Sequence, residues 1–429
     1  MWPVEVVVAR VAAKVETGRV SLRAAMEDFF AEHPELGPVR GLVRAFSLGM
    51  LRYALQVDWL LTRVTGVDTA SLPPFERNLL RALVYEYRYR GICLDRVTRL
   101  LRRVSGVRLS ARDLEALAEA DLDELTSGMR WGERASILYS VPRWVAEYLG
   151  SLLGEAEAER MLERMNRPAT LWLRVNTLRT TRRALLEALR GRGFGVEPDP
   201  DLPDVVRVTR LAGNLSHTPE HRAGHFYLQD KASALAAHLL RPEGVVYDMC
   251  AAPGGKATHA YQLSGGRATV VAAEWKKGRM ANLRAVTARL RTPIDPLVAD
   301  SRLPPLRKAD TVILDPDCSS LGRLGHSPEI RLWAMPDLVE RYARLQRELL
   351  RAAARVLGRG GRLVYSTCTL TLEENEGNVK WATDELGLEP LDAEPRVGLP
   401  GLLGLRQAQR LYPHIHDTQG FFACLLAKA

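Results

Sequence analysis

The spacing of hydrophobic residues divides the chain into a helical first part and a last part of mixed pattern. From Val43 to Leu60, apolar positions recur at alternating steps of three and four, which places them on one face of a helix. Residues 1 to about 130 show this periodicity without the alternation typical of strands. We therefore expect an all-α domain over 1–130.

From about residue 226 onward, short apolar runs alternate with helical segments. This alternation predicts a mostly parallel, Rossmann-like α/β sheet over 226–429, with helices on both faces. Binding residues in such a fold follow the carboxyl ends of the strands. The predicted strands are VVYDM, TVVAAE, PLVAD, TVILD, RLVYS and FFACLLA.

Residues 137–225 connect these two parts. Trp144 to Met165 is helical in pattern and rich in Glu and Leu. The strand-like LWLRVNTL, the helical RRALLEALRGRGF and the strand-like DVVRVTRL follow it. This order predicts a linker helix and a small α/β subdomain.

Composition narrows the class of protein without identifying a partner. The chain carries 60 basic and 51 acidic residues, a net charge of +9, and most of the basic residues are Arg. It has five cysteines and no CxxC pair, so we expect no disulfide framework and no metal site. No apolar run is long enough for a membrane span, and the start has no secretory pattern. We expect a cytoplasmic monomer.

One segment of the N-terminal part is strongly basic. Phe75 to Arg112 holds ten Arg against three acidic residues, and Tyr85, Tyr87 and Tyr89 lie among them. Guanidinium groups and aromatic rings suit RNA phosphates and bases. The alternative is a solvated helix face with tyrosines packed in the core.

The first predicted strand of the α/β part runs into CAAPGGKATH, Cys250 to His259. Gly254 and Gly255 allow a tight turn and close approach of the backbone to a ligand, and a helix starting near Lys256 would point free N–H groups at it. This loop has neither the phosphate-binding loop pattern nor GxGxxG.

Three later strands end in acidic residues, namely Glu274, Asp300 and Asp315, and Arg279 follows the first of them by about one turn. A single such acid could be a helix cap. Three acids behind a glycine loop fit a positively charged nucleoside such as S-adenosylmethionine, since a carboxylate after the second strand often holds ribose hydroxyls.

Two cysteines also follow strands, Cys318 in DPDCSSLG and Cys368 in VYSTCTL. A thiol beside a methyl donor suits carbon 5 of a pyrimidine, because thiolate addition at carbon 6 makes carbon 5 nucleophilic. The alternative for either cysteine is packing in the core. Spacing alone does not say which thiol attacks.

At these residues the chain resembles the RNA 5-methylcytosine methyltransferases of the RsmB/Nop/NSUN family. The resemblance covers about residues 160–429 and rests on an ordered series. The series is RVN at Arg174–Asn176, QD at Gln229–Asp230, CAAPGGK, DPDCSSLG, YSTCTL with Glu374-Asn375-Glu376, and Gly420-Phe421-Phe422. The N-terminal helices resemble the NusB-like RNA-binding domain of the RsmB branch, in RAFSLGMLRYALQVDWLL and PPFERNLLRALVYEY.

The resemblance implies a Rossmann-like methyltransferase domain, S-adenosyl-L-methionine as cofactor and RNA as substrate, ribosomal RNA in preference to transfer RNA. It implies that Glu274 holds the ribose with Arg279 nearby, that Asp300 faces the adenine, and that Asp315 lies near the methionine end and the cytosine. Cys368 would be the nucleophile, and Cys318 would assist release. The loop residues that would wrap the cofactor are Cys250, Ala251, Ala252, Pro253, Gly254, Gly255 and Lys256.

Two positions depart from the family pattern, which has Pro before Cys318 and Gly two residues after it. This chain has Asp317 and Ser320 there. A carboxylate beside Cys318 is expected to raise the pKa of its thiol, or to act as a base itself. Two other functional hypotheses stay open: a catalytically idle RNA-binding or assembly factor with the same fold, and a nicotinamide enzyme with a thiol nucleophile.

Overall fold

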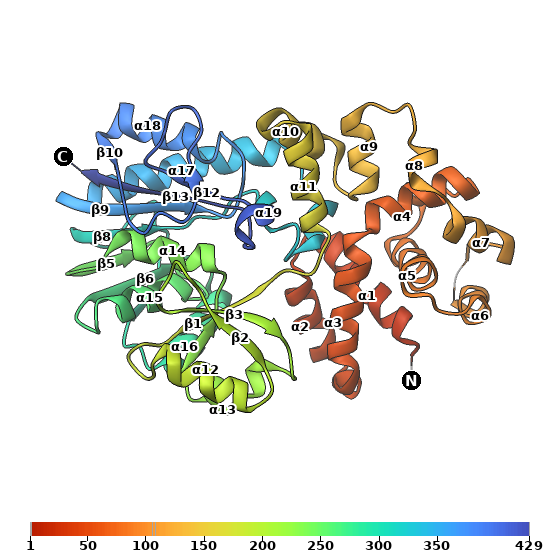
Figure 1. Cartoon of the computed structure of the whole chain (residues 1–429), viewed down its shortest axis with the longest axis horizontal. Helices are drawn as coiled ribbons and strands as arrows, with labels where there is room; N and C mark the ends of the chain where they lie inside the picture. The colour runs from red at the N-terminus through yellow and green to blue at the C-terminus, as the bar shows by residue number, and fades with distance from the viewer. Residues whose placement is uncertain (1, 105, 108, 429) are drawn as a thin grey trace. The chain divides into compact units, whose positions relative to one another are not determined.

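The computed structural model describes residues 2–104, 106, 107 and 109–428, and its contacts define two compact units. Unit 1 comprises Met1–Pro168 and Arg323–Met335, and unit 2 comprises Ala169–Gly322 and Pro336–Ala429. Figure 1 shows the ribbon coloured along the chain. No described helix is both long enough and apolar enough to cross a membrane.

Unit 1 is helical, as predicted for its first part, and its described residues include no strand. Helix α1 packs against α5, and the segment predicted as one helix from Val43 to Leu60 is divided into α3 and α4 at Tyr53. The unit extends beyond residue 130, since α9 to α11 belong to it. Its helices are α1 Val4–Gly18, α2 Leu22–Glu32, α3 Arg40–Arg52, α4 Ala54–Leu60, α5 Pro74–Arg90, α6 Leu94–Val104, α7 Ala111–Glu119, α8 Leu122–Leu125, α9 Trp131–Leu138, α10 Arg143–Leu153 and α11 Glu155–Met165.

The segment Arg323–Met335 joins unit 1 although it comes from the middle of the α/β sequence. Arg331 is its anchor, with 1% of its surface exposed. Its guanidinium donates to the carbonyl oxygens of Arg52 at 2.5 Å and Tyr139 at 3.2 Å. The sequence contains no indication of this, because the bonds of Arg331 to the rest of the unit go to backbone carbonyls far away in the sequence.

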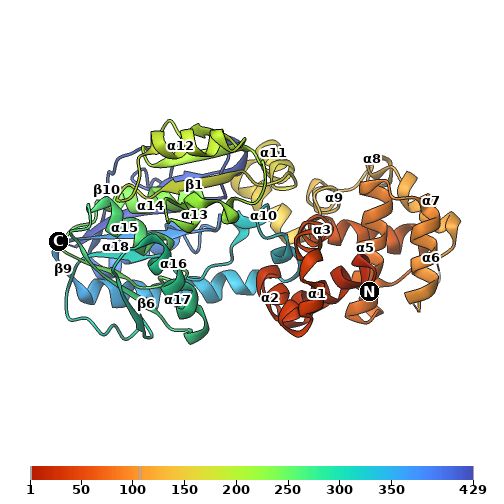
Figure 2. The ribbon, with the colours of Figure 1, turned by 90° about the horizontal axis from the view of Figure 1, so that it is seen from below.

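A small antiparallel sheet opens unit 2, in the order β2-β3-β1-β4. Its strands β1 and β3 are the two predicted ones, and α12 lies over one face of it in Figures 1 and 2. The added strands β2 and β4 are only four and three residues long, too short for a periodic pattern. The elements are β1 Leu171–Val175, α12 Arg182–Gly191, β2 Gly195–Pro198, β3 Val205–Arg210, α13 Pro219–Arg222 and β4 Phe226–Leu228.

The second sheet of unit 2 has the order β11-β12-β13-β9-β8-β5-β6-β7, with β10 paired to β13. Strands β5 to β9 run parallel, and β13 is antiparallel to β9, which confirms the predicted mostly parallel sheet. Its elements are α14 Lys231–Leu240, β5 Val245–Asp248, α15 Gly255–Leu263, β6 Thr269–Glu274, α16 Lys277–Leu290, β7 Asp295–Val298, β8 Ala309–Leu314, α17 Pro336–Val356, β9 Leu357–Thr367, α18 Glu376–Leu386, β10 Leu388–Leu391, β11 Leu399–Pro400, β12 Gln409–Leu411, α19 Pro413–His416 and β13 Phe421–Lys428.

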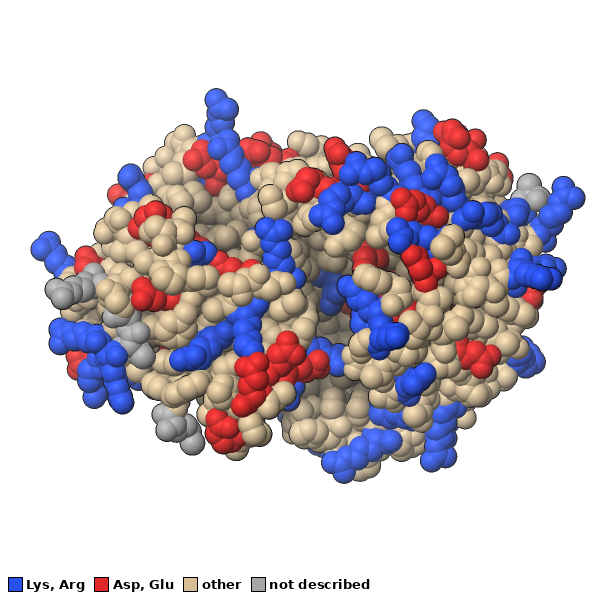
Figure 3. All heavy atoms as spheres, turned by 180° about the vertical axis from the view of Figure 1, so that it is seen from behind, with Lys and Arg blue, Asp and Glu red and all other residues tan. Residues whose placement is uncertain are grey.

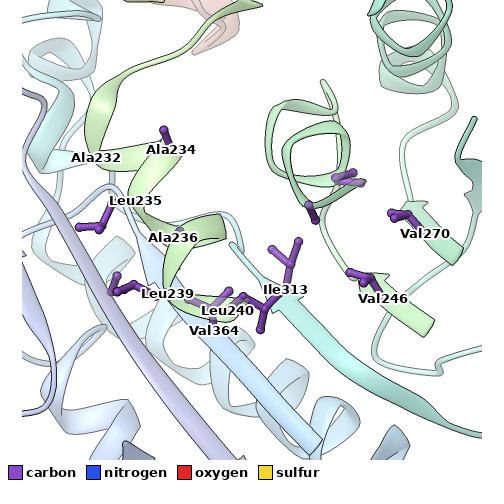
Figure 4. Packing of buried hydrophobic residues seen from close by; sticks show 14 of the residues in the cluster. Ala232, Ala234, Leu235, Ala236, Leu239, Leu240, Val246, Val270, Ile313 and Val364 are labelled. Carbon is purple, nitrogen blue, oxygen red and sulfur yellow. The ribbon is translucent and has the colours of Figure 1, made fainter. Parts of the chain in front are cut away.

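Alternate residues of these strands enter two separate cores, one on each face of the sheet. Val246, Ile313 and Val364 pack with α14, α15 and α16, and Figure 4 shows Leu240 of α14 close to Ile313 and Val364. Their neighbours Tyr247 and Val312 enter the core with α17 and α18. Side chains of successive strand residues point to opposite faces, so both faces need a helical cover.

The order of the strands locates the site. From β5 the chain moves outward through β6 to β7, and then returns to β8 on the other side of β5. The carboxyl ends of β5 and β8 therefore border the point at which the direction of winding reverses. Ligands of open α/β sheets bind in the crevice at this switch point.

Candidate active site

The loop after β5 is shaped by a close approach that only glycine allows. Gly254 has a φ of 105°, and a Cβ there would lie 2.6 Å from Leu283 Cδ1. The N–H of Ala251 donates to Ala273 O on β6 at 2.9 Å, which fixes the loop at the edge of the sheet. Helix α15 starts at Gly255, so its free N–H groups lie at this edge, as the sequence predicted.

Arg174 supports the same loop from the small sheet. Its fully buried guanidinium donates to Thr258 Oγ1 at 3.0 Å, to Gln229 Oε1 at 2.7 Å, and to Gly255 O. Burial without a bonded carboxylate lowers the pKa of Arg174 to about 10. RVN and QD were recognised in the sequence without a role, and this contact places both beside the loop.

Glu274 and Arg279 form a second support. Glu274 is 2% exposed at the end of β6, where Oε1 accepts from the N–H of Lys276 at 2.9 Å. Arg279 Nη1 lies 3.4 Å from Glu274 Oε2, and its Nη2 donates to Ala252 O at 2.6 Å. The predicted pair is therefore brought together, and Arg279 links it to the loop.

The sequence missed Asp248, the last residue of β5. Its Oδ1 accepts from the N–H of Cys250 at 3.3 Å, whereas Oδ2 is buried without a described hydrogen-bond partner. Burial raises the pKa of Asp248 to about 7. A strand-end acid was the available signal, but the strand was predicted to end at Met249. An unsatisfied buried carboxyl oxygen beside a glycine loop fits a cationic ligand such as S-adenosylmethionine.

Asp315 lies just past β8, beside the loop. Lys256 Nζ donates to Asp315 Oδ2 at 2.5 Å and to Ser233 Oγ at 2.9 Å. Ser366 Oγ donates to the other oxygen, Oδ1, at 2.9 Å. These bonds hold the carboxylate in one orientation while 30% of the side chain stays exposed.

The two cysteines meet at this edge. Cys318 Sγ and Cys368 Sγ are 3.2 Å apart, with Cys318 7% exposed and Cys368 partly exposed. Ser320 Oγ lies 3.5 Å from Cys368 Sγ. Ser320 has a φ of 58°, the left-handed conformation for which the glycine of the family pattern is suited.

Glu374 holds the loop that carries Cys318. It is fully buried and accepts from the Ser319 N–H at 2.9 Å, from Ser319 Oγ, from Thr371 Oγ1 at 2.8 Å and from Gln346 Nε2 at 3.0 Å. Burial raises the pKa of Glu374 in spite of these bonds. Glu374 was recognised only as part of a motif, and its partners are 28 to 55 residues away in sequence, with Thr371 as the exception.

The carboxylate of Asp317 has a different effect from the one expected. The pKa of the Cys318 thiol is indeed raised, but the causes are its hydrogen bond to Cys368, burial and the charge of Glu374. Asp317 is 47% exposed and lies 3.7 Å from Arg279 Nη1. Its charge is therefore balanced by Arg279 and screened by solvent.

Asp300 is the least enclosed of the predicted site residues. Its side chain is 43% exposed and pairs with Arg302 Nη2 at 2.7 Å, which lowers the pKa of Asp300. Its contact with adenine stays a prediction. The other acids and the loop give a cradle with three carboxylates, Asp248, Glu274 and Asp315, and one partnered lysine.

Known proteins similar to this chain identify its family. The family model described as 16S rRNA methyltransferase RsmB/F matches residues 236–427, and that of the RsmF/B-like ferredoxin-like domain matches residues 141–212. The chain is 28% identical over 432 residues to the probable ribosomal RNA small subunit methyltransferase B of Synechocystis, spanning 94% of this chain and 95% of that one. It is 38% identical over 269 residues to the tRNA (cytosine(72)-C(5))-methyltransferase of Pyrococcus horikoshii, spanning 61% and 65%.

Solved structures agree with these sequence matches. The crystal structure of PH0851 matches with a TM-score of 0.81 at 27% identity and covers 100% of this chain and 99% of its own. That of NSun6 from Pyrococcus horikoshii with SFG matches with a TM-score of 0.63 at 29% identity, covering 68% of this chain and 99% of its own. The chain therefore belongs to the RsmB/F family of S-adenosylmethionine-dependent RNA methyltransferases.

Proposed function

We propose that this protein methylates carbon 5 of cytosine in structured RNA through a covalent bond from Cys368 to carbon 6 of the base. The observation that carries the proposal is the pair of thiols 3.2 Å apart, on the loops that follow adjacent strands β8 and β9. Ribosomal RNA is the favoured substrate, because the relative matched over 95% of its length is a probable ribosomal RNA enzyme. Transfer RNA is the second candidate, by the match to a tRNA enzyme.

The surroundings of the two thiols favour Cys368 as the nucleophile. Cys318 is buried, and its hydrogen bond to Cys368 raises the pKa of Cys318 well above that of a free thiol. Cys318 therefore keeps its proton near neutral pH, and either sulfur can donate in the contact between them. Cys368 is the more accessible of the two thiols, which places it better to reach the base of an RNA substrate.

Asp315 is the residue proposed to hold the cytosine, and Lys256 and Ser366 fix its orientation. Lys256 neutralises one oxygen of Asp315, and Ser366 donates to the other. Asp315 can thus hold the ring of the cytosine by a hydrogen bond without rotating away. Cys318 is placed to assist the last stage, when the carbon 5 proton leaves and Cys368 is expelled.

S-adenosylmethionine supplies the electrophilic methyl group when it is bound. On this chain, Asp248, Glu274 and the loop Cys250–Lys256 are the groups that would hold it. The carboxyl group of Asp248 would face its positive charge, Glu274 would hold its ribose, and the N–H groups at the start of α15 would be available to its carboxylate. Arg174 and Arg279 keep the loop in place for this contact.

Replacement of Cys368 by Ala tests the proposal. We expect loss of methyl transfer to unmodified RNA and of any protein–RNA adduct that survives denaturation, with S-adenosylmethionine binding retained. Cys424→Ala is the matched control, because Cys424 is fully buried on β13 and bonds only a backbone carbonyl. Unchanged methylation by Cys368→Ala would refute the nucleophile.

Bisulfite mapping of RNA from cells that lack the protein identifies the substrate. One cytosine in ribosomal RNA should become fully convertible. If the wild-type protein neither modifies RNA in cells nor transfers methyl groups to it in vitro, an idle RNA-binding or assembly factor with this fold is the better description.

A further inference from the structure

The two thiols of the site are placed for a reaction with each other as well as with RNA. Cys318 Sγ and Cys368 Sγ are 3.2 Å apart, and a disulfide has a sulfur–sulfur bond of about 2.05 Å. Their contact is already within the sum of van der Waals radii, so a side-chain adjustment of about 1 Å joins them.

The loops that carry the two sulfurs are fastened to each other by bonds that do not involve the thiols. The N–H of Gly322 donates to Cys368 O at 3.0 Å. Ser319 Oγ lies 2.6 Å from Thr369 Oγ1, and the Ser319 N–H donates to Glu374 at 2.9 Å. The reduced pair is therefore held in alignment, and ring closure costs little chain entropy.

We propose that Cys318 and Cys368 form a reversible disulfide when the protein meets hydrogen peroxide or an organic hydroperoxide, a modification that blocks the site. Cys368 reacts first because it is partly exposed, whereas Cys318 is buried. Its thiolate attacks one peroxide oxygen, the O–O bond breaks, and a sulfenic acid forms as hydroxide leaves. Cys318 then attacks this sulfur, the S–S bond forms, the S–O bond breaks, and the thiol proton leaves with the oxygen as water.

The balance is two thiols and one peroxide to one disulfide and two waters, or one water and one alcohol with an organic hydroperoxide. The consequence for catalysis rests on the proposed function, since the disulfide removes both thiols assigned to the reaction. It also protects Cys368 from the irreversible sulfinic and sulfonic states, because the sulfenic acid is captured by its neighbour. A dithiol reductant then restores the site.

The test is to treat the reduced protein with stoichiometric hydrogen peroxide, in the absence of RNA, and to follow intact mass, linked peptides and methyl transfer together. We expect a loss of two hydrogen masses and a peptide pair joining Cys318 to Cys368. Methyl transfer should fall in proportion to the linked fraction, and dithiothreitol should restore both. Cys93→Ser is the matched control, because Cys93 is exposed and its removal leaves the pair intact.

In contrast to Cys93→Ser, the variant Cys318→Ser removes one thiol of the pair. Without the second thiol, Cys368 should gain two oxygen masses in excess peroxide, and dithiothreitol should not reverse this. The proposal is overturned if wild-type Cys368 becomes sulfinic while Cys318 remains a free thiol, or if Cys318 links to other cysteines as readily. A linked protein that still methylates RNA would instead support the disulfide and refute Cys368 as the nucleophile.

Discussion

Two regions of this chain are rich in charged or reactive side chains, and the fold places these side chains differently in each. In the basic segment Phe75–Arg112, several arginines turn inward: Arg81 pairs with Asp58 at 2.5 Å and Glu16 at 3.0 Å, and Arg88 donates to the carbonyl of Leu117. At the edge of the large sheet, residues scattered from Asp248 to Glu374 converge on one site. Many charged residues close together in the sequence do not by themselves form a site, whereas residues that follow several neighbouring strands are brought together in space.

The contact of the basic segment with RNA remains a prediction, and the structure narrows it. Tyr53, Tyr85 and Tyr89 stack on each other with centroids 4.4 to 6.1 Å apart, so two of the three tyrosines of the segment are engaged with protein. Arg102 and Arg103 of α6 are exposed. Arg108 lies outside the described residues. Among the described residues of the segment, Arg99 and Arg112 are exposed as well, and these four arginines are available to bind phosphate.

The largest effect on stability should come from replacing Arg81, the arginine that faces inward. Arg81→Met leaves Asp58 without its cation and leaves Glu16 with Arg77 alone, and both carboxylates are under 20% exposed. We expect a loss of about 3 kcal/mol in the free energy of unfolding, as for other buried pairs deprived of one partner. Arg102→Met, on the exposed face, should change stability by less than about 0.5 kcal/mol and weaken RNA binding instead. Denaturant unfolding and RNA titration measure the two. Equal destabilisation by both variants would remove the distinction.

Asp315→Asn tests the convergent region. Loss of the carboxylate removes the ion pair with Lys256 and the oriented contact proposed for the cytosine. We expect the single-turnover rate of methyl transfer to fall on the order of 100-fold, the scale of one preorganised group at a reacting centre. Asp317→Asn is the matched control, because this exposed carboxylate only faces Arg279 at 3.7 Å, and its effect should stay below about fivefold.

Acid should lower the stability of unit 2 through a buried cluster of Asp204, His238 and His259. Asp204 lies 2.7 Å from the Nε2 atoms of both His238 and His259, which are hydrogen-bond distances. Burial, with Arg174 nearby, lowers the pKa of His259 to about 3, and the histidines lower that of Asp204. Below pH 6.5 the unfolded chain therefore binds a proton at His259 that the folded chain does not.

The free energy of unfolding should accordingly fall from about pH 6.5 toward 3, by up to about 1.4 kcal/mol per pH unit for His259. Asp204 adds to this loss only below the pKa that it has in the unfolded chain, about 4. His259→Gln should flatten this slope, whereas His217→Gln, at an exposed position, should not. Thermal unfolding across this pH range gives both slopes. An unchanged slope in His259→Gln would assign the acid effect to other groups.

The smallest effect concerns Ser320, which has the left-handed φ of 58° beside both thiols. Ser320→Gly should stabilise the protein by about 1 kcal/mol, because glycine adopts this conformation without strain. It also removes a hydroxyl 3.5 Å from Cys368 Sγ, so the pH at which Cys368 reacts with iodoacetamide should change. A destabilised variant would show that the hydroxyl contributes more than the strain costs.

The sequence predicts the positions of the site residues but not the partners that they bond. It placed Cys318 and Cys368 after adjacent strands but could not rank them, since the ranking depends on burial and on a contact between residues 50 apart. It missed Asp248 because the end of a strand is read only to within a residue or two. It assigned the raised pKa of Cys318 to Asp317, although neighbours in sequence can face different ways.

By itself, the sequence determined the helical first part, the mostly parallel sheet and the ordered motifs of the family, because periodicity and strand-end residues are local properties. Tertiary structure alone decided that Arg323–Met335 joins the helical unit, that Arg81 faces inward, and that the two thiols touch. Each of these is a contact through space between distant segments. Such contacts are selected by packing, by paired charge and by satisfied hydrogen bonds, which no local pattern contains.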